Sequence, residues 1–331
     1  MTGASIPYQL RPNKFIDRQL FIELLSRIVV PRGPERYIYV SMGGPHLVDH
    51  HTVYNEFGID AQYCFDQDER VVARQRFNRP TRKTICEKIS ASELPARLDG
   101  LFQKFRGKKN LVVWLDYTGV NRGDQFQEAV EVLRRLRHGD VFRITLNANP
   151  STLCSGDEWK NKNLTGPGEC RAKKLSDQLG SYFPAGITKI SEHEVLGVLI
   201  NSFGLAASAA EMLTAGVRFR PALTTAYRDG QQMLTITCVA EDTRANDADL
   251  IRPLNRWKFV SKNWSDCHRI KAPFFSAREQ SRIEGSLHQG PKKLLRALAF
   301  LPDEDETKSL EALLSFKKFH RFHPYFRNVE K

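Results

Sequence analysis

Glycine and acidic residues that follow apolar, strand-like runs are the positions of this sequence best suited to bind a ligand. Gly43 and Gly44 follow one such run, and Asp66 and Asp116 each close another. In an open α/β sheet, ligands bind at the carboxyl ends of the parallel strands. A glycine pair followed by an acid at the next strand end is typical of cofactor binding. We therefore predict a ligand site built from these residues.

Each of these residues also has a simpler structural interpretation. The glycine pair fits an ordinary strand-to-helix turn, and Asp116 fits an exposed turn. Asp66 fits the N-cap of the following helix, where aspartate is favoured. Asp68 and Glu69 are close competitors for the ligand-binding position.

Three histidines near the glycine turn are candidates for a catalytic base or a metal site. His46 and His50 are four residues apart, but no cysteine or carboxylate motif completes a recognisable site. We expect all three, including His51, at the surface or lining the crevice. A histidine can act as a general base near neutral pH, and His46 adjoins the glycine turn.

A magnesium site is a weaker hypothesis. Asn147 and Asn149 end a later strand-like run and are predicted to project into the same crevice as Asp116. Oxygen ligands suit Mg²⁺, but the spacing is not diagnostic. We therefore predict no bound metal.

The order of the elements is that of a doubly wound α/β sheet. Five strand-like runs alternate with helical patterns between residues 37 and 150, which favours a parallel sheet with right-handed crossovers. Two further runs within 219–242 flank Asp229-Gly230, a strong hairpin pattern. The sequence predicts a mostly parallel sheet closed by a terminal antiparallel hairpin.

Changes of pattern divide the chain into three parts. Residues 1–36 contain an amphipathic helix at 13–30, and residues 37–242 form the α/β domain. A polar, glycine-rich and lysine-rich stretch at about 153–187 predicts an insertion or lid. Residues 243–331 form a helical extension with a basic, aromatic tail.

The chain is basic, with 50 Lys and Arg against 38 acidic residues and a formal charge of +12. Such an excess attracts polyanions. The basic clusters are Arg70–Lys83, Lys104–Lys109 and Lys317–Arg327. The last interleaves aromatic and basic residues, which suits base stacking with phosphate contacts, although its aromatics fit docking on the core equally well. Nucleic acid is therefore a candidate partner.

The cysteines and the apolar runs indicate the compartment. No two of the six cysteines form a Cys-x-x-Cys pair, so a zinc ribbon is not favoured and reduced structural thiols are expected. No apolar run approaches the roughly 20 residues needed to cross a bilayer, and Met1 to Arg11 lack the apolar stretch of a secretory signal. We expect a cytoplasmic protein with no membrane partner.

Several segments together resemble class I S-adenosylmethionine (SAM) dependent methyltransferases. Within that class the chain is similar to bacterial proteins labelled O-methyltransferase, some of them found near phage-defence genes. The resemblance implies a Rossmann-like methyltransferase sheet, SAM as cofactor and methyl transfer as activity. The segments that carry it are RPNKFIDRQLFIELL (11–25), YVSMGGPHLVD (39–49), FDQDERVVARQRFNRP (65–80), WLDYTG (114–119) and FRPALTTAYRDGQQMLTIT (219–237).

The resemblance implies a set of cofactor-binding residues. Gly43 and Gly44 match the glycine turn that lies against the methionine part of SAM, and Ser41 belongs to the same turn. Asp66 matches the acid that binds the ribose hydroxyls, since a carboxylate accepts two hydrogen bonds from a diol. Lys14, in the leading segment, is placed at the cofactor entrance.

The resemblance also implies catalytic residues. Asp116 matches the position that faces the sulfonium and the nucleophile; Tyr117 follows it, and His46 is the candidate base. The family's first motif commonly has three glycines, whereas Met42 and Pro45 stand here. The strand end Asp-Tyr-Thr-Gly lacks the prolines of DNA amino-methyltransferases, and no Pro-Cys pair supports C5-cytosine chemistry.

The sequence thus predicts a SAM-dependent methyltransferase acting on an unidentified nucleophile, with nucleic acid as one candidate. The alternative is a catalytically silent scaffold or sensor that binds SAM or a nucleotide, with a protein partner in an antiviral defence complex; the incomplete glycine motif favours it. An NAD-dependent oxidoreductase is least favoured, because the G-x-G-x-x-G turn is missing and a terminal hairpin is atypical of dehydrogenases.

Overall fold

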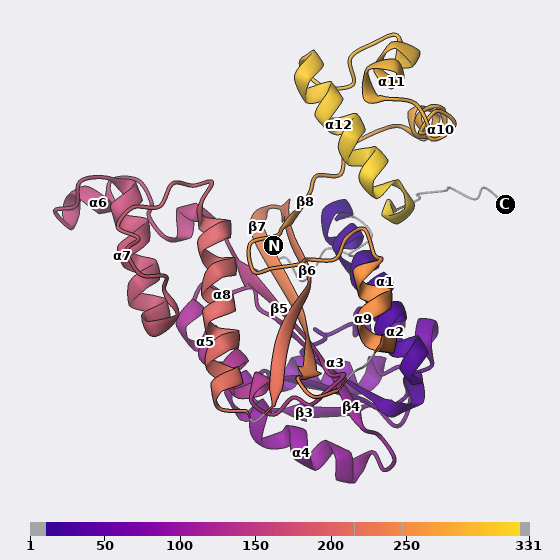
Figure 1. The fold of residues 1–331 in the computed structure, drawn as a ribbon, viewed down its shortest axis with the longest axis vertical. Helices are drawn as coiled ribbons and strands as arrows, with labels where there is room; N and C mark the ends of the chain where they lie inside the picture. The colour runs from indigo at the N-terminus through magenta and orange to yellow at the C-terminus, as the bar shows by residue number, and fades with distance from the viewer. Residues whose placement is uncertain (1–10, 215, 246–247, 325–331) are drawn as a thin grey trace. The chain divides into compact units, whose positions relative to one another are not determined.

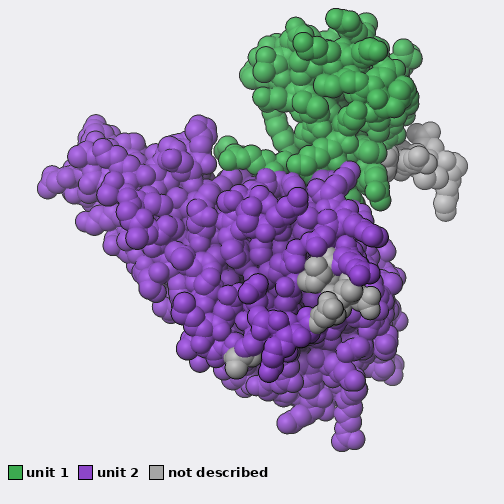
Figure 2. Space-filling model, in the orientation of Figure 1, with its two compact units in different colours: residues 1–21, 227–230, 269–331 green, residues 22–226, 231–268 purple. Residues whose placement is uncertain are grey.

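The computed structural model describes residues 11–214, 216–245 and 248–324. The chain divides into two compact units, which Figure 2 colours separately. Unit 1 comprises residues 1–21, 227–230 and 269–331, and unit 2 comprises residues 22–226 and 231–268. The end of the predicted tail Lys317–Arg327 lies outside the described residues.

The strands form one sheet in the order β3-β2-β1-β4-β5-β7-β6-β8 (Figure 1). β1 to β5 run parallel, and β7 pairs antiparallel with β5. β6 and β7 are joined at Gly230, whose φ of 96° is the left-handed conformation that glycine adopts readily. The predicted fold class, a mostly parallel doubly wound sheet with a terminal antiparallel hairpin, is confirmed. The bounds are β1 Tyr37–Ser41, β2 Gln62–Asp66, β3 Ile85–Lys88, β4 Asn110–Asp116, β5 Val141–Asn147, β6 Val217–Asp229, β7 Gln231–Asp242 and β8 His268–Ile270.

Helices cover both faces of the sheet. Ile38 and Val40 of β1 face a large core that they share with apolar residues of α4, α5, α7 and α8. Tyr39, between them, points to the other face, where its ring meets His50 of α2 edge-on at 4.8 Å. The α-helices that precede β8 in the chain are α1 Pro12–Arg32, α2 Val48–Phe57, α3 Glu69–Asn78, α4 Leu94–Lys104, α5 Arg122–Leu133, α6 Glu158–Asn161, α7 Pro167–Leu179, α8 Val195–Met212 and α9 Ala248–Asn255.

The segment 153–187 contains α6, α7 and the short helix Gly180–Tyr182. Ala172, Leu175 and Leu179 of α7 are buried in the main core. The polar composition that predicts an insertion or lid comes from the exposed side of these helices. At least α7 is therefore anchored to the rest of unit 2.

α8 is long and apolar enough to cross a membrane by length and composition, with a mean hydropathy of 1.5 over 18 residues. However, 61% of this window is buried inside the fold, and the core helix of a globular domain passes the same test. α8 packs against α5 (Figure 1). Its apolar character therefore has a sufficient explanation in the core.

Unit 1 has a small core of its own. It is formed by α10 (Ala277–Glu284), α11 (Pro291–Leu298) and α12 (Glu306–Phe319), with Leu313 and Phe316 fully buried. Ser276 begins α10 with a capping box, in which its side chain and that of Glu279 satisfy each other's backbone N–H groups.

Candidate functional site

The register of the parallel strands places two predicted site residues, Asp66 and Asp116, at the same level. Ser41, the last residue of β1, pairs with the residue two before Asp66 on β2 and with the residue two before Asp116 on β4. Gly43 lies two residues after Ser41, in the turn that begins where β1 ends. Neighbouring strands are about 4.8 Å apart, so the two acids flank the glycine turn at the carboxyl edge of the sheet.

The two glycines of this turn have different physical roles. Both have positive φ, 69° for Gly43 and 58° for Gly44. A Cβ on Gly43 would come within 2.6 Å of the Leu47 side chain and 2.9 Å of His50, whereas a Cβ on Gly44 would meet nothing within 4 Å. Gly43 also donates its N–H to Ser41 Oγ at 3.2 Å. Packing therefore requires glycine at 43, while Gly44 leaves open space beside its backbone.

Two amide side chains of α3 hold the glycine turn in place. The fully buried Gln75 donates to the carbonyl oxygens of Met42 at 2.7 Å and Gly44 at 3.3 Å. Asn78 donates to the Pro45 carbonyl at 2.9 Å. Sequence reasoning missed both residues; their spacing of three on the helix that follows Asp66 was the available clue.

The sequence allows Asp66 either to bind a ligand or to cap the following helix, and in the structure Asp68 is the residue that caps α3. Asp68 is the N-cap of α3 and accepts a hydrogen bond from Arg70 N–H at 2.8 Å. Asp66 lies just before this cap, and its Oδ1 accepts from Asp68 N–H at 2.8 Å. Burial raises the pKa of Asp66, against the opposing effect of that hydrogen bond. Asp66 is thus a partly desolvated carboxylate at the edge of the sheet, and the capping role belongs to its neighbour.

Tyr117 follows Asp116 but directs its hydroxyl toward α5. It donates a hydrogen bond to Glu128, and its backbone N–H donates to Thr145 O at 3.2 Å. Burial, and then the Glu128 charge, raise the pKa of Tyr117, and burial also raises the pKa of Glu128. The phenol therefore stays protonated near neutral pH and acts as a donor. Asp116, the last residue of β4, is the other catalytic candidate of this segment.

The three histidines occupy different environments, and that of His51 is partly buried, with its Nε2 2.7 Å from Asn78 O. His46 is exposed, with Nε2 3.4 Å from Arg74 Nη2. His50 is fully buried, and its Nδ1 lies 3.0 Å from Gln62 Oε1. Burial lowers the pKa of His50 to about 4, so the ring is neutral at physiological pH. The prediction of a surface or crevice position is wrong for His50, because its side of α2 packs on the sheet.

Lys14 belongs to unit 1, whereas the residues at the sheet edge belong to unit 2. Its backbone N–H donates to Asp229 Oδ2 at 2.7 Å, and Asn13 Nδ2 donates to Asp229 Oδ1 at 2.9 Å. These contacts tie the leading segment to the hairpin turn. A role for Lys14 at the cofactor entrance stays a prediction.

The asparagines after β5 are occupied by local turns. Asn147 Oδ1 accepts from Asn149 N–H at 3.0 Å, and Asn149 Oδ1 accepts from Ser151 N–H at 3.2 Å. These are the oxygens that a magnesium site with Asp116 would need. Their use in the turns gives that hypothesis no support.

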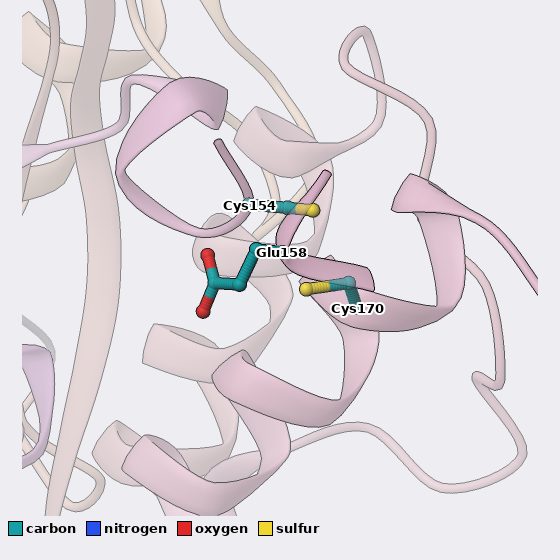
Figure 3. Close-up of side chains that lie close together, drawn as sticks. All are labelled: Cys154, Glu158 and Cys170. Carbon is teal, nitrogen blue, oxygen red and sulfur yellow. The ribbon is translucent and has the colours of Figure 1, made fainter. Parts of the chain in front are cut away.

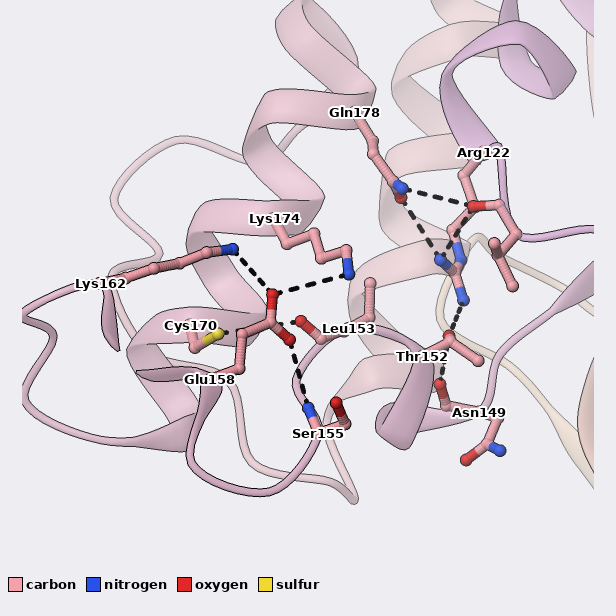
Figure 4. Close-up of polar contacts among 11 residues, drawn as sticks. Arg122, Asn149, Thr152, Leu153, Ser155, Glu158, Lys162, Cys170, Lys174 and Gln178 are labelled. Carbon is pink, nitrogen blue, oxygen red and sulfur yellow. Dashed lines mark hydrogen bonds and ion pairs between the residues drawn. The ribbon is translucent and has the colours of Figure 1, made fainter. Parts of the chain in front are cut away.

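Arg122, the first residue of α5, is fully buried and holds this loop (Figure 4). Its Nε donates to Asn147 O at 2.9 Å, its Nη2 to Thr152 Oγ1 at 2.7 Å and its Nη1 to Gln178 Oε1 at 3.3 Å. Burial lowers the pKa of Arg122 to about 10, so the guanidinium stays charged at neutral pH. The Arg122 side chain thus connects the start of α5, which follows β4, to the loop after β5 and to α7.

Replacing Arg122 by leucine should lower the free energy of unfolding by about 2 kcal/mol, because several buried acceptors lose their donor. Arg134→Leu, at the C-cap of the same helix, is the matched control: this arginine pairs with Glu131 at 2.7 Å on the surface, and its loss should cost less than about 1 kcal/mol. Urea unfolding measures both. Equal losses would mean that the Arg122 contacts do not stabilise the loop.

Several residues of the predicted basic clusters form surface ion pairs. Arg70 pairs with Asp68 at 2.7 Å, and Lys83 and Lys108 both pair with Asp60, at 2.5 Å and 3.4 Å. The positive charge of these clusters is therefore partly balanced by nearby carboxylates. Nucleic-acid binding stays a prediction.

Comparison with known proteins places the whole chain in one family. A family model described as "Putative O-methyltransferase" matches residues 6–331. No curated protein sequence matches significantly.

Solved structures give distant matches. Trm1 from Pyrococcus horikoshii with S-adenosyl-L-methionine is 11% identical, with a TM-score of 0.44 over 69% of this chain and 55% of that one. The plantazolicin methyltransferase BamL in complex with a triazolic desmethylPZN analogue and SAH is 10% identical, with a TM-score of 0.39 over 71% and 89% of the two chains. The 16S rRNA (adenine(1408)-N(1))-methyltransferase from Catenulisporales acidiphilia is 14% identical, with a TM-score of 0.35 over 63% and 87%. The chain thus spans about half the length of the Trm1 chain, and similarities this low assign no residue roles.

Proposed function

The chain belongs to the family described as putative O-methyltransferases, and from this premise we propose that it transfers the methyl group of SAM to an acceptor held beside Asp116. SAM is the cofactor of this methyltransferase family. The observation that carries the proposal is that β2 and β4 end at the same level in Asp66 and Asp116, on either side of the strand that leads into the Gly43-Gly44 turn. It brings a backbone-exposing turn and two carboxylates to the ligand-binding edge of the sheet.

The residues at this edge fit the two ends of the cofactor. Open space beside Gly44 accommodates the amino-acid end, which needs close approach to the backbone. Asp66, one strand away, is suited to accept two hydrogen bonds from the ribose diol. Ser41 supports the turn from below through its bond to Gly43.

Bound SAM supplies an electrophilic methyl group on a sulfonium. Methyl transfer would form one bond from the acceptor oxygen or nitrogen to the methyl carbon and break the bond from that carbon to sulfur, which leaves S-adenosylhomocysteine, and the acceptor would release its proton to solvent. In-line displacement depends on positioning above all. We assign the positioning of the acceptor to Asp116. Its carboxylate would accept a hydrogen bond from the acceptor and stabilise the positive charge that develops on the acceptor.

We propose a nucleic acid as the acceptor. α3, which starts three residues after Asp66, exposes the aromatic ring of Phe77 to 89%. Arg74 and Arg79, also exposed, lie within three residues of it along the chain. An exposed aromatic side chain among arginines suits base stacking combined with phosphate contacts.

One experiment tests both the activity and the acceptor. The purified chain is incubated with SAM labelled with tritium in the methyl group and with cell extract, which is then separated into RNA, DNA, protein and small molecules. We expect label in the RNA or DNA fraction. Label confined to protein or small molecules would contradict the nucleic-acid acceptor but retain the methyltransferase activity.

A catalytically silent SAM-binding scaffold, with a protein partner in an antiviral defence complex, is the second candidate. Two observations favour it: the Tyr117 hydroxyl bonds to Glu128, and His46 is exposed. Of the three predicted catalytic residues, only Asp116 is then left to act on the acceptor at the edge of the sheet. Isothermal titration separates the two candidates: SAM binding with no label in any fraction selects the scaffold.

Gly44→Ala should weaken SAM binding by about tenfold, because the new methyl group enters the space assigned to the cofactor and a positive φ strains alanine by about 1 kcal/mol. Gly58→Ala is the matched control: Gly58 has a φ of 68° and nothing within 4 Å of a Cβ, but it lies at the end of α2. Both variants should lose similar stability. Equal SAM affinity in the two would show that the cofactor does not approach Gly44.

A further inference from the structure

Cys154, Glu158 and Cys170 form a cluster that includes none of the residues assigned above to SAM or the acceptor (Figure 3). Their ligand atoms, two sulfurs and a carboxylate oxygen, all lie within 4.8 Å of one another. Cys154 follows the short helix after β5, Glu158 begins α6, and Cys170 is on α7. Three separate elements thus converge on one point.

The two thiols are well shielded from water. Cys154 is 8% exposed and Cys170 is 2% exposed, and both are free cysteines. Thiols bind a divalent cation as thiolates, so each would release its proton on binding.

The Glu158 carboxylate is held by two lysine side chains and one backbone N–H group (Figure 4). Its Oε1 lies 2.8 Å from Lys162 Nζ and 3.9 Å from Lys174 Nζ, and its Oε2 accepts from Ser155 N–H at 3.4 Å. Groups that hydrogen-bond to a ligand carboxylate orient it toward a metal. Two thiolates and a carboxylate with a divalent cation carry a net charge of −1, which one lysine balances.

We propose that Cys154, Glu158 and Cys170 bind a zinc ion, with a water molecule as fourth ligand. Thiolate and carboxylate ligands in a four-coordinate site suit zinc, whereas magnesium and calcium prefer oxygen ligands alone. The ion links α6 to α7 and to the chain after β5. This inference is independent of the proposed methyl transfer. The sequence analysis missed it because the ligand spacings, three and eleven intervening residues, are not those of a zinc ribbon.

The unmodified full chain provides the first test. It is purified under reducing conditions, given zinc, and passed through a desalting column before its metal content is measured. We expect about one zinc per chain, and X-ray absorption should show two sulfur neighbours at about 2.3 Å and oxygen neighbours at about 2.0–2.2 Å. No retained zinc, an all-oxygen shell, or a Cys154–Cys170 disulfide that persists under these conditions would overturn the proposal.

Variants locate the ion. Cys154→Ser and Cys170→Ser should each lose the zinc, and Lys162→Ala should weaken zinc binding by about tenfold. Cys86→Ser is the matched control, since Cys86 also neighbours a second thiol, Cys64 on the adjacent strand, and it should keep the zinc. Zinc retained by both cluster variants, or lost from the control alone, would contradict the assignment. The wild-type absorption spectrum decides the ligand set even if a variant fails to fold.

Discussion

Asp116→Asn is expected to lower the rate of methyl transfer by about 10²- to 10³-fold and to change SAM affinity by less than about threefold. Asparagine fills the same volume but carries no charge, so it stabilises the positive charge on the attacking acceptor far less. The interaction that is lost is made in the transition state rather than with the bound cofactor. Transfer of labelled methyl groups to the acceptor fraction measures the rate, and isothermal titration measures the affinity.

Asp124→Asn is the control for this prediction. Asp124 is exposed in the first turn of α5, so the same substitution occurs in the segment after β4 without touching the strand end. Transfer by this variant should stay near the wild-type rate. A fully active Asp116→Asn enzyme would remove Asp116 from the mechanism, and a large loss of SAM binding would make it a cofactor ligand instead.

Asp66→Asn is expected to weaken SAM binding by about 10- to 100-fold, because hydrogen bonds from the ribose to an ionised acceptor are worth about 1.5–3 kcal/mol. The amide side chain keeps one acceptor oxygen, so the turn with Asp68 is retained. Isothermal titration of SAM into the two proteins measures the difference.

The pH dependence of SAM binding gives this prediction its sign. Burial raises the pKa of Asp66 above its usual value of 3.8. The ionised form accepts from the diol, so affinity should be full at neutral pH and fall as the pH drops through the raised pKa. Asp66→Asn should abolish this pH dependence, while Asp68→Asn should retain it. Affinity that is independent of both pH and Asp66 would place the ribose elsewhere.

The fold and the level of the site residues were accessible from the sequence for a physical reason. Strand-like runs ending in glycine or aspartate fix which residues lie at strand ends, and parallel strands share one carboxyl edge. Gly43, Asp66 and Asp116 therefore follow from local pattern together with sheet topology. The hairpin follows from Asp229-Gly230 between two strand-like runs, since few residues other than glycine adopt the conformation of Gly230.

Contacts between distant elements could not be predicted in this way. Nothing in the sequence around Tyr117 indicates that its hydroxyl meets Glu128, because that contact depends on how α5 packs on the sheet. The burial of His50 likewise depends on the rotation of α2 about its axis. Cys154 and Cys170 are brought together by the folding of a polar segment that resembles a loop in composition. Tertiary packing, rather than local preference, decides each of these.

A crystal structure with S-adenosylhomocysteine bound would test the central claim most directly. We predict ribose hydroxyls within hydrogen-bond distance of Asp66, the amino-acid end over Gly44, and the sulfur facing the Asp116 side of the glycine turn. The product bound at another edge of the sheet, or protein side chains filling the space beside Gly44 in the complex, would contradict the account.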